Sequence, residues 1–256
     1  MIERWEEEQK DLWFWEKIGR LPFALLDRIT PRILRDWIGQ LLDELGAYIQ
    51  TGGRYLINQH AMLDRLSQET GQPSGSIGLS QVPYLPLTVM DHVAEDLQKS
   101  RAEVAKYQGA TTGVGGFLTL AIDIPVLLGL SLKTAQEMAL VHGYDPREKK
   151  ERIFIVQCLQ FASADYVGKQ AILKNLSSFH LKDAERESIS QLQGWHEVIA
   201  TYRDHLGWKK LFQLVPIAGI LFGAWINKAA VGNVAEVTRM LYRKRRILEK
   251  LESIES

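Results

Sequence analysis

Apolar residues along this chain recur mostly with the three- and four-residue spacing of helices. Between Thr88 and Tyr107, one stripe of valine and leucine is separated by charged residues. β-Branched residues are scattered, and no run alternates apolar and polar positions over the length of a strand. The pattern therefore predicts an all-α protein, folded as a compact multi-helix bundle.

Glycine, proline and capping residues divide the chain into further helices. Thr30 and Asp145 each precede a proline, as at a helix start, and Gly71 and Gly143 each follow a helical pattern, as at a helix end. A Lys133/Glu137 pair would lie one turn apart on its helix. The expected helices are 3–18, 30–49, 54–69, 88–107, 126–142, 147–176, 182–206 and 208–254, the last three each broken or bent within.

The clearest interruption is GQPSGSIGLSQVPYLPL, residues 71–87, where three prolines forbid a continuous helix. It suggests a boundary between an N-terminal helical section, 1–80, and a second helical section, 81–256. The two sections could also form one continuous globular unit.

Two apolar segments, Thr111–Leu132 and Leu211–Ile226, approach the length of about 20 residues that crosses a bilayer. The second is short, and an aspartate near the middle of a membrane span would cost roughly 2.5–3.5 kcal/mol. The mean hydropathy of the whole chain, −0.14, is that of a soluble protein. We expect both segments to be central, buried helices that contain glycine and proline. Conditional insertion into a bilayer and constitutive spanning remain as alternatives.

Small residues in these segments would let helices approach closely, either in a protein core or in lipid. In the first segment they are Gly109, Gly113, Gly115 and Gly116, and in the second Gly219 and Gly223, which follow Pro216.

Asp123, two residues before Pro125, is the charged residue of the first segment. It could cap a helix that restarts after a break at the proline. It could instead pair in the interior with a basic residue such as Arg239 or Arg243, or act as a catalytic or ligand-binding group.

A basic run, Arg243, Lys244, Arg245 and Arg246, lies near the C-terminus. Residues 228–250 include seven basic residues and only two acidic ones. The run could face anionic lipid or a partner, at about 1 kcal/mol per basic residue near a membrane. It could also be a solvated helix end. Trp5 and the aromatic residues at 13–15 could lie at a membrane interface, but the acidic residues among them favour packing on the protein body.

Composition excludes several classes of protein. The formal net charge of zero recruits no nucleic acid. The single cysteine, Cys158, lies in an apolar run, which predicts a core residue in a reducing compartment. His196-Glu197 lacks the second histidine of a zincin motif, and no phosphate-binding loop or hydrolase elbow is present. The sequence therefore predicts no metal and no cofactor. The acidic start of the chain is unlike a secretory signal and favours the cytoplasm.

Two motifs resemble the EcsC family of bacterial proteins, named for a gene beside an ABC transporter operon. The first is Thr112–Gly116 followed by Asp123-Ile124-Pro125. The second runs from Val215-Pro216 through Gly219 to Asn227, and the likeness extends over roughly residues 88–246. The resemblance implies a largely helical protein with a genomic link to transport or secretion, and it supplies no catalytic residues.

These observations together suggest a non-enzymatic accessory protein, peripheral to the inner face of the cell membrane, with an anionic lipid surface or a membrane-protein complex such as an ABC transporter as its partner. One alternative is a hydrolase with Asp123 near a histidine such as His142. The other is a protein that inserts into the membrane conditionally.

Overall fold

The computed structural model describes residues 1–8, 57–112, 117–163, 172 and 216–255. Its elements are helices joined by turns, and no strand occurs in these ranges. The prediction of an all-α bundle is confirmed. The helices are α1 (Ile2–Glu8), α5 (Gln59–Glu69), α6 (Leu87–Thr112), α7 (Phe117–Val141), α8 (Lys149–Ser163) and α12 (Pro216–Glu255), with a short 3-10 helix, η1 (Leu79–Tyr84).

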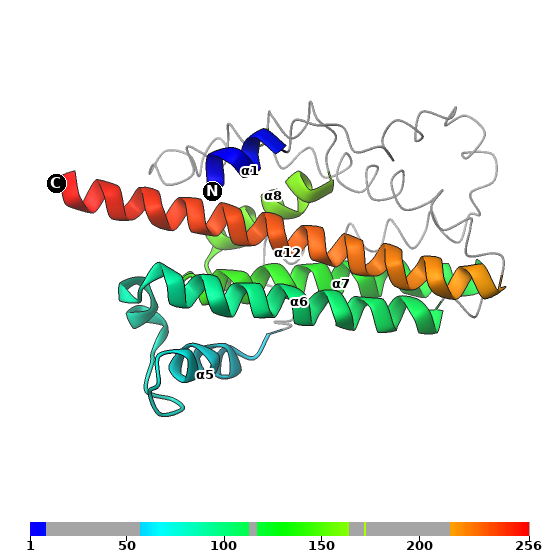
Figure 1. Ribbon diagram of the computed structural model, residues 1–256, viewed down its shortest axis with the longest axis horizontal. Helices are drawn as coiled ribbons and strands as arrows, with labels where there is room; N and C mark the ends of the chain where they lie inside the picture. The colour runs from blue at the N-terminus through cyan, green and yellow to red at the C-terminus, as the bar shows by residue number, and fades with distance from the viewer. Residues whose placement is uncertain (9–56, 113–116, 164–171, 173–215, 256) are drawn as a thin grey trace.

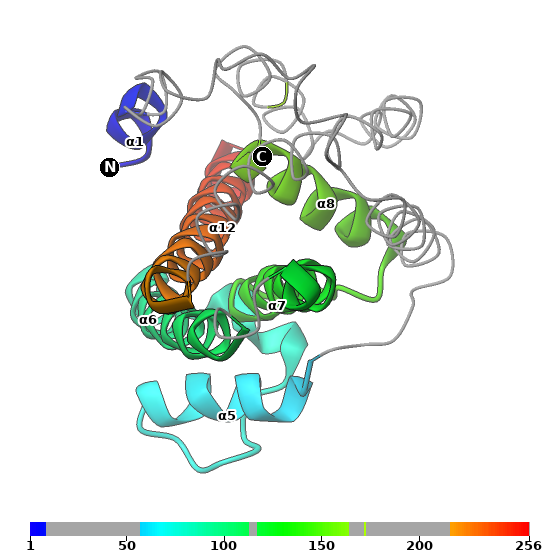
Figure 2. The same cartoon turned by 90° about the vertical axis from the view of Figure 1, so that its right-hand side faces the viewer.

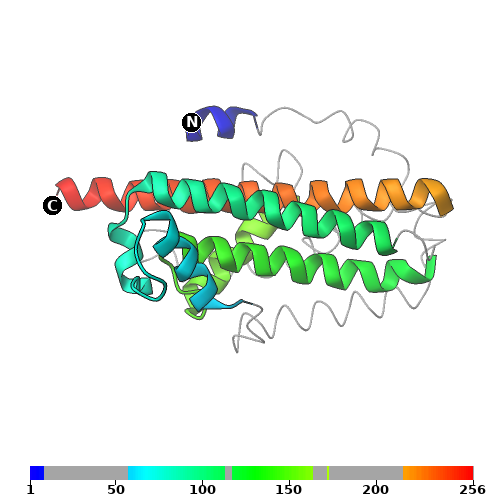
Figure 3. The same cartoon turned by 60° about the horizontal axis from the view of Figure 1, so that its bottom comes forward.

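Three long helices, α6, α7 and α12, lie side by side and form the body of the molecule (Figures 1 and 3). Ion pairs Arg239–Glu95 and Lys228–Glu103 show that α12 runs antiparallel to α6. Because α7 also runs antiparallel to α6, helices α7 and α12 begin at the same end of the bundle. Figure 2 views that end, with α5 against α6 and α7 on one side and α8 against α7 and α12 on the other.

The buried residues form two clusters of unequal size. The larger one draws on α5, α6, α7, α8 and α12 and includes Trp5 of α1. The smaller one, at the end where α7 and α12 begin, consists of Ala105, Leu127, Ile226 and Val231. Residues before and after position 80 therefore contribute to one core.

The turns match the glycine and proline signals closely. Gly71 and Gly143 follow α5 and α7 with φ of 70° and 81°, values that favour glycine. The backbone amide of Tyr144 donates to the carbonyl of Ala139, which closes the end of α7. The predicted interruption at 71–87 is confirmed, since turns and η1 occupy it before α6 begins at Leu87.

The expected break at Pro125 is wrong, because α7 runs without interruption from Phe117 to Val141. A proline inside a helix costs about 3 kcal/mol. Leu127 and Leu128, two and three residues after the proline, are buried, and each contributes about 1.5–3 kcal/mol, which offsets that cost. The predicted helix start at 126 is therefore nine residues too late.

Other helix starts differ by a few residues. Helix α5 begins at Gln59 because the Asn58 side chain accepts a hydrogen bond from the amide of Ala61 at 3.2 Å. Helix α8 begins at Lys149, two residues later than predicted, because Asp145 accepts from the amide of Arg147 within a preceding turn. Helix α12 is continuous over its 40 residues, where a break or bend was expected. The helices predicted at 30–49 and 182–206 lie outside the described residues.

Within the described ranges, no helix combines the length and the apolar character that crossing a bilayer requires.

Candidate functional site

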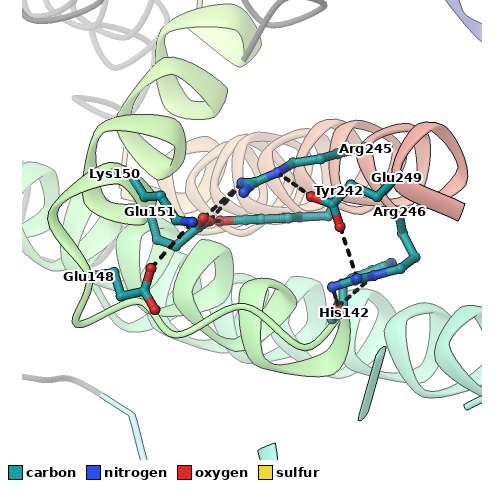
Figure 4. A network of polar contacts seen from close by, with 8 residues as sticks. All are labelled: His142, Glu148, Lys150, Glu151, Tyr242, Arg245, Arg246 and Glu249. Atoms are coloured by element: carbon teal, nitrogen blue, oxygen red, sulfur yellow. Dashed lines mark hydrogen bonds and ion pairs between the residues drawn. The ribbon is translucent and has the colours of Figure 1, made fainter. Parts of the chain in front are cut away.

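A cluster of buried charges joins the start of α8 to the last part of α12 (Figure 4). A guanidinium nitrogen of Arg245 lies 2.8 Å from a carboxylate oxygen of Glu151, and these side chains are 8% and 1% exposed. The hydroxyl of Tyr242 donates to the other Glu151 oxygen at 3.3 Å. Arg245 also contacts Glu249, one turn further along α12, at 3.2 Å.

The neighbouring arginine, Arg246, binds the end of α7. Its guanidinium donates to the backbone carbonyl of His142 at 2.6 Å and to Glu249 at 2.9 Å. Carbonyls at a helix end lack intrahelical donors, so Arg246 satisfies one of them. The guanidinium carbons of Arg245 and Arg246 lie 4.1 and 4.3 Å from the ring centroid of Tyr144, which is a cation–π arrangement.

Burial shifts the protonation equilibria in this cluster. Burial raises the pKa of the Glu151 carboxyl, and the Arg245 guanidinium counteracts part of that shift. Burial lowers the pKa of His142 to about 4, although its Nδ1 lies 2.8 Å from the Met138 carbonyl, which favours the charged form. His142 is therefore neutral at pH 7, with the proton on Nδ1, where it can donate to that carbonyl. Because the charges and the imidazole are buried, the cluster serves to hold α7, α8 and α12 together.

The basic run, which the sequence suggested as lipid- or partner-facing, forms ion pairs within the chain. Arg245 and Arg246 are buried, as described above. Arg243 binds Asp91 of α6 at 2.9 Å, both side chains being 18% exposed, and Lys244 binds Glu6 of α1 at 2.7 Å. Each cation of the run thus has a carboxylate partner within the chain. Glu249 lies three residues after Arg246, but the other acidic partners lie up to 238 residues away in sequence, so no local pattern could reveal those.

Asp123 lies within α7, six residues after its start, so it does not cap a restarted helix. Its two suggested partners are bound elsewhere, Arg239 to Glu95 and Arg243 to Asp91. Ile226 packs with Leu127, one turn after Asp123. Arg239 lies 13 residues beyond Ile226, or about 20 Å along α12. The Asp123 side chain itself lies outside the described part of the chain.

The hydrolase arrangement of Asp123 beside His142 is also wrong. Because α7 is continuous, the 19 residues from Asp123 to His142 span about 28 Å. His142 directly follows the last residue of α7. The two groups therefore lie at opposite ends of the bundle.

Gly109 of the glycine-rich motif and the second apolar motif both lie at the end of the bundle where α7 and α12 begin. Gly109 is buried in the last turn of α6, and Pro216 starts α12, which also contains Gly219 and Gly223. Asn227, in the same motif, is fully buried. Gly113, Gly115 and Gly116 lie outside the described residues, as do the aromatic residues at 13–15.

Two predictions from single residues are confirmed. Cys158 is fully buried, and burial raises the pKa of its thiol well above the usual value, as befits a core residue. Trp5 packs on the protein body, where it is 6% exposed and donates from its indole to Glu236 at 2.9 Å. Among the residues that the structure describes, no three His, Cys, Asp or Glu side chains gather as a metal ion would require.

The structure thus defines a helical bundle whose helix ends are joined by buried ion pairs. The EcsC protein family matches this chain over residues 1–247, and the chain belongs to that family. The match begins at the first residue and extends well beyond the two motifs. Comparison with curated proteins agrees with this assignment. The chain is 51% identical to "Uncharacterized protein YdbA" of Bacillus subtilis (strain 168) over 254 residues, which cover 99% of this chain and 93% of that protein. It is 27% identical to "Protein EcsC" of the same organism over 165 residues, 64% of this chain and 67% of that protein. No solved structure matches.

Proposed function

We propose that this protein is a non-enzymatic accessory protein that attaches peripherally to the inner face of the cell membrane. One observation carries the proposal. The first halves of α7 and α12 lie at the same end of the bundle, and they are nearly without charge. Asp123 is the one charged residue in 117–132, and 216–227 contains none. A bundle with one such end is suited to attachment by apolar contact.

The buried ion pairs at the opposite end support the non-enzymatic part of the proposal. Glu151 and Arg245 neutralise each other, and His142 is fully buried, so these groups are poorly placed to meet a substrate. The link to transport or secretion comes from the family resemblance. In this proposal the protein serves a membrane-protein complex, such as an ABC transporter, from the cytoplasmic side.

Fractionation of cells that express the protein tests the attachment. Salt screens ionic contacts but leaves apolar contacts intact. We therefore expect the protein in the membrane pellet, where it stays through a wash in about 1 M salt and is released by alkaline carbonate. Recovery in the soluble fraction would refute the attachment. Retention through carbonate would refute its peripheral nature and favour an inserted helix.

A further inference from the structure

Exposed apolar side chains surround the smaller core cluster. Ala105, Leu127 and Ile226 pack together inside the bundle, one from each long helix. The residue directly before each of them is an exposed apolar one, and a tyrosine on α6 joins them. Together these make up what is called here the apolar ring: Val104 (44% exposed), Tyr107 (67%), Val126 (46%) and Trp225 (44%).

Exposed large apolar side chains are concentrated in the ring. Of the eight large hydrophobic side chains that are exposed in the described part of the chain, four belong to it. Because Ala105, Leu127 and Ile226 are in one cluster, their ring neighbours lie at one level of the bundle. Exposed apolar residues gathered at one level mark a site of interaction more often than the same residues scattered singly.

Lysines accompany both aromatic residues of the ring. The ammonium of Lys106 lies 5.6 Å from the ring centroid of Tyr107, and Lys228 follows Trp225 by three residues. Both lysines bind the same carboxylate, Glu103. The two lysines and the one glutamate together give the surface beside the apolar ring a net positive charge. Tryptophan and tyrosine with lysine beside them are the residues that lie at the boundary between lipid tails and head groups.

We propose that the apolar ring is the surface by which the protein rests on a phospholipid bilayer. Trp225 and Tyr107 lie at the level of the head groups, and Lys106 and Lys228 face the lipid phosphates. The net positive charge beside the ring complements an anionic leaflet, and this complementarity favours lipid over another apolar partner. The inference rests on the proposed membrane attachment and adds to it the site and the chemistry of the lipid.

Sedimentation of the purified chain with vesicles tests the ring. The vesicles contain phosphatidylcholine alone or with phosphatidylglycerol, and the variant is Trp225→Ala with Tyr107→Ala. Removing about half of the burial energy of a large side chain at each position predicts roughly a twenty-fold loss of partition. Binding of the unaltered chain is expected to be tighter to the anionic vesicles. Circular dichroism and a thermal melt establish that the variant is folded.

A matched control lies at the other end of the bundle. Tyr84 and Ile254 are 87% and 79% exposed, and they lie near each other because Lys250 of α12 donates to the carbonyl of Leu85. The variant Tyr84→Ala with Ile254→Ala removes a comparable apolar area and should bind vesicles as the unaltered chain does. An equal loss of vesicle binding in both variants, or no loss in either, would contradict the proposal that the ring binds lipid.

A second readout does not depend on affinity. Lipids brominated in the upper acyl chain quench tryptophan fluorescence on contact, and Trp225→Phe should remove most of that quenching while the protein still binds. Unchanged quenching would contradict the placement of Trp225. If the chain fractionates with cell membranes but binds neither kind of vesicle, the lipid site is wrong and a membrane protein is the partner. If it does neither, the proposed attachment itself fails.

Discussion

The two ends of the three-helix body are built from the same helices but in opposite ways. At the end where α7 finishes, Arg245 and Glu151 are buried against each other, and Arg246 binds the carbonyl of His142, directly after α7. At the end where α7 begins, the helices are nearly uncharged, and apolar side chains such as Tyr107 and Trp225 are exposed. At the first end the charged side chains are buried, and at the second end apolar side chains are exposed.

This contrast shows that charge in a sequence is a poor guide to charge on a surface. The stretch 228–250 carries seven basic residues against two acidic ones, an excess of five (7 − 2). In the fold, carboxylates from α1, α6 and α8 bind these cations, so little of the excess remains for an external partner. The features suited to recognition lie instead on the apolar segments, which the hydrophobic pattern assigned wholly to the interior.

The largest effect is expected from Glu151→Gln, which leaves the buried Arg245 without its main counter-charge. Removing one partner of a buried ion pair costs about 3–5 kcal/mol. Urea unfolding measures the loss. The control is the same substitution at the other end, Glu103→Gln, where the side chain is 41% exposed and the solvent-screened pair should contribute far less. Equal losses at the two sites would show that burial does not distinguish the two ends.

The next effect concerns pH. His142 has a pKa of about 4 in the folded protein and about 6.5 when unfolded, so below pH 6.5 a proton binds the unfolded chain preferentially. Its contribution to stability is complete above pH 6.5 and falls with pH until about pH 4. Between pH 6.5 and 5 the loss is about 2 kcal/mol. Unfolding of the unaltered chain and of His142→Gln is compared over this range. The difference between their pH slopes isolates His142, and parallel slopes would contradict its buried, neutral state.

A smaller difference is expected between the glycines that follow α5 and α7. A Cβ at Gly143 would lie 2.9 Å from Cδ of Pro83, in addition to the cost of its φ of 81°. Gly71 has a similar φ of 70°, but a Cβ there would meet nothing within 4 Å. Both alanine variants pay about 1–2 kcal/mol for the backbone conformation. Gly143→Ala should lose about 1 kcal/mol more, as crowding in a packed site costs. Equal thermal midpoints would mean that Pro83 moves aside without cost.

The smallest effect on stability is expected at the apolar end. Tyr107 is 67% exposed, so Tyr107→Ala should change the free energy of unfolding by no more than about 0.5 kcal/mol. The same chemical-denaturation measurement applies. A loss above about 2 kcal/mol would show that Tyr107 stabilises the fold and is not a spare surface group.

Local signals in the sequence predicted local structure well. Gly71, Gly143 and the prolines of 71–87 act within a few residues of themselves, and the turns they predict are present. Pro125 led to a wrong prediction of a helix break. The cost of a proline is local and visible in the sequence, whereas the burial that offsets it involves neighbouring helices. The pair suggested between Glu137 and Lys133 was misleading for the same reason. Glu137 lies one turn from Lys133, but Arg101 of α6 binds both of its carboxylate oxygens at 2.6 Å.

The candidate site was the least predictable part. Except for Glu249 of α12 itself, the carboxylates that bind the basic run are spread over α1, α6 and α8, and only folding brings them to α12. The two apolar segments were expected to form central helices, and Leu127 of one does pack with Ile226 of the other. A sequence shows which residues are charged or apolar, but the partner of each is decided across distances of tens to hundreds of residues.

Hydrogen exchange of the chain with and without anionic vesicles tests the central claim most directly, because it reports which end meets the membrane. We expect slower exchange in peptides from 104–112, 117–128 and 216–228 when vesicles are present, and no change in 242–255. Protection confined to 242–255, where the basic run lies, would contradict the account and return the basic run to the role of the lipid-binding surface.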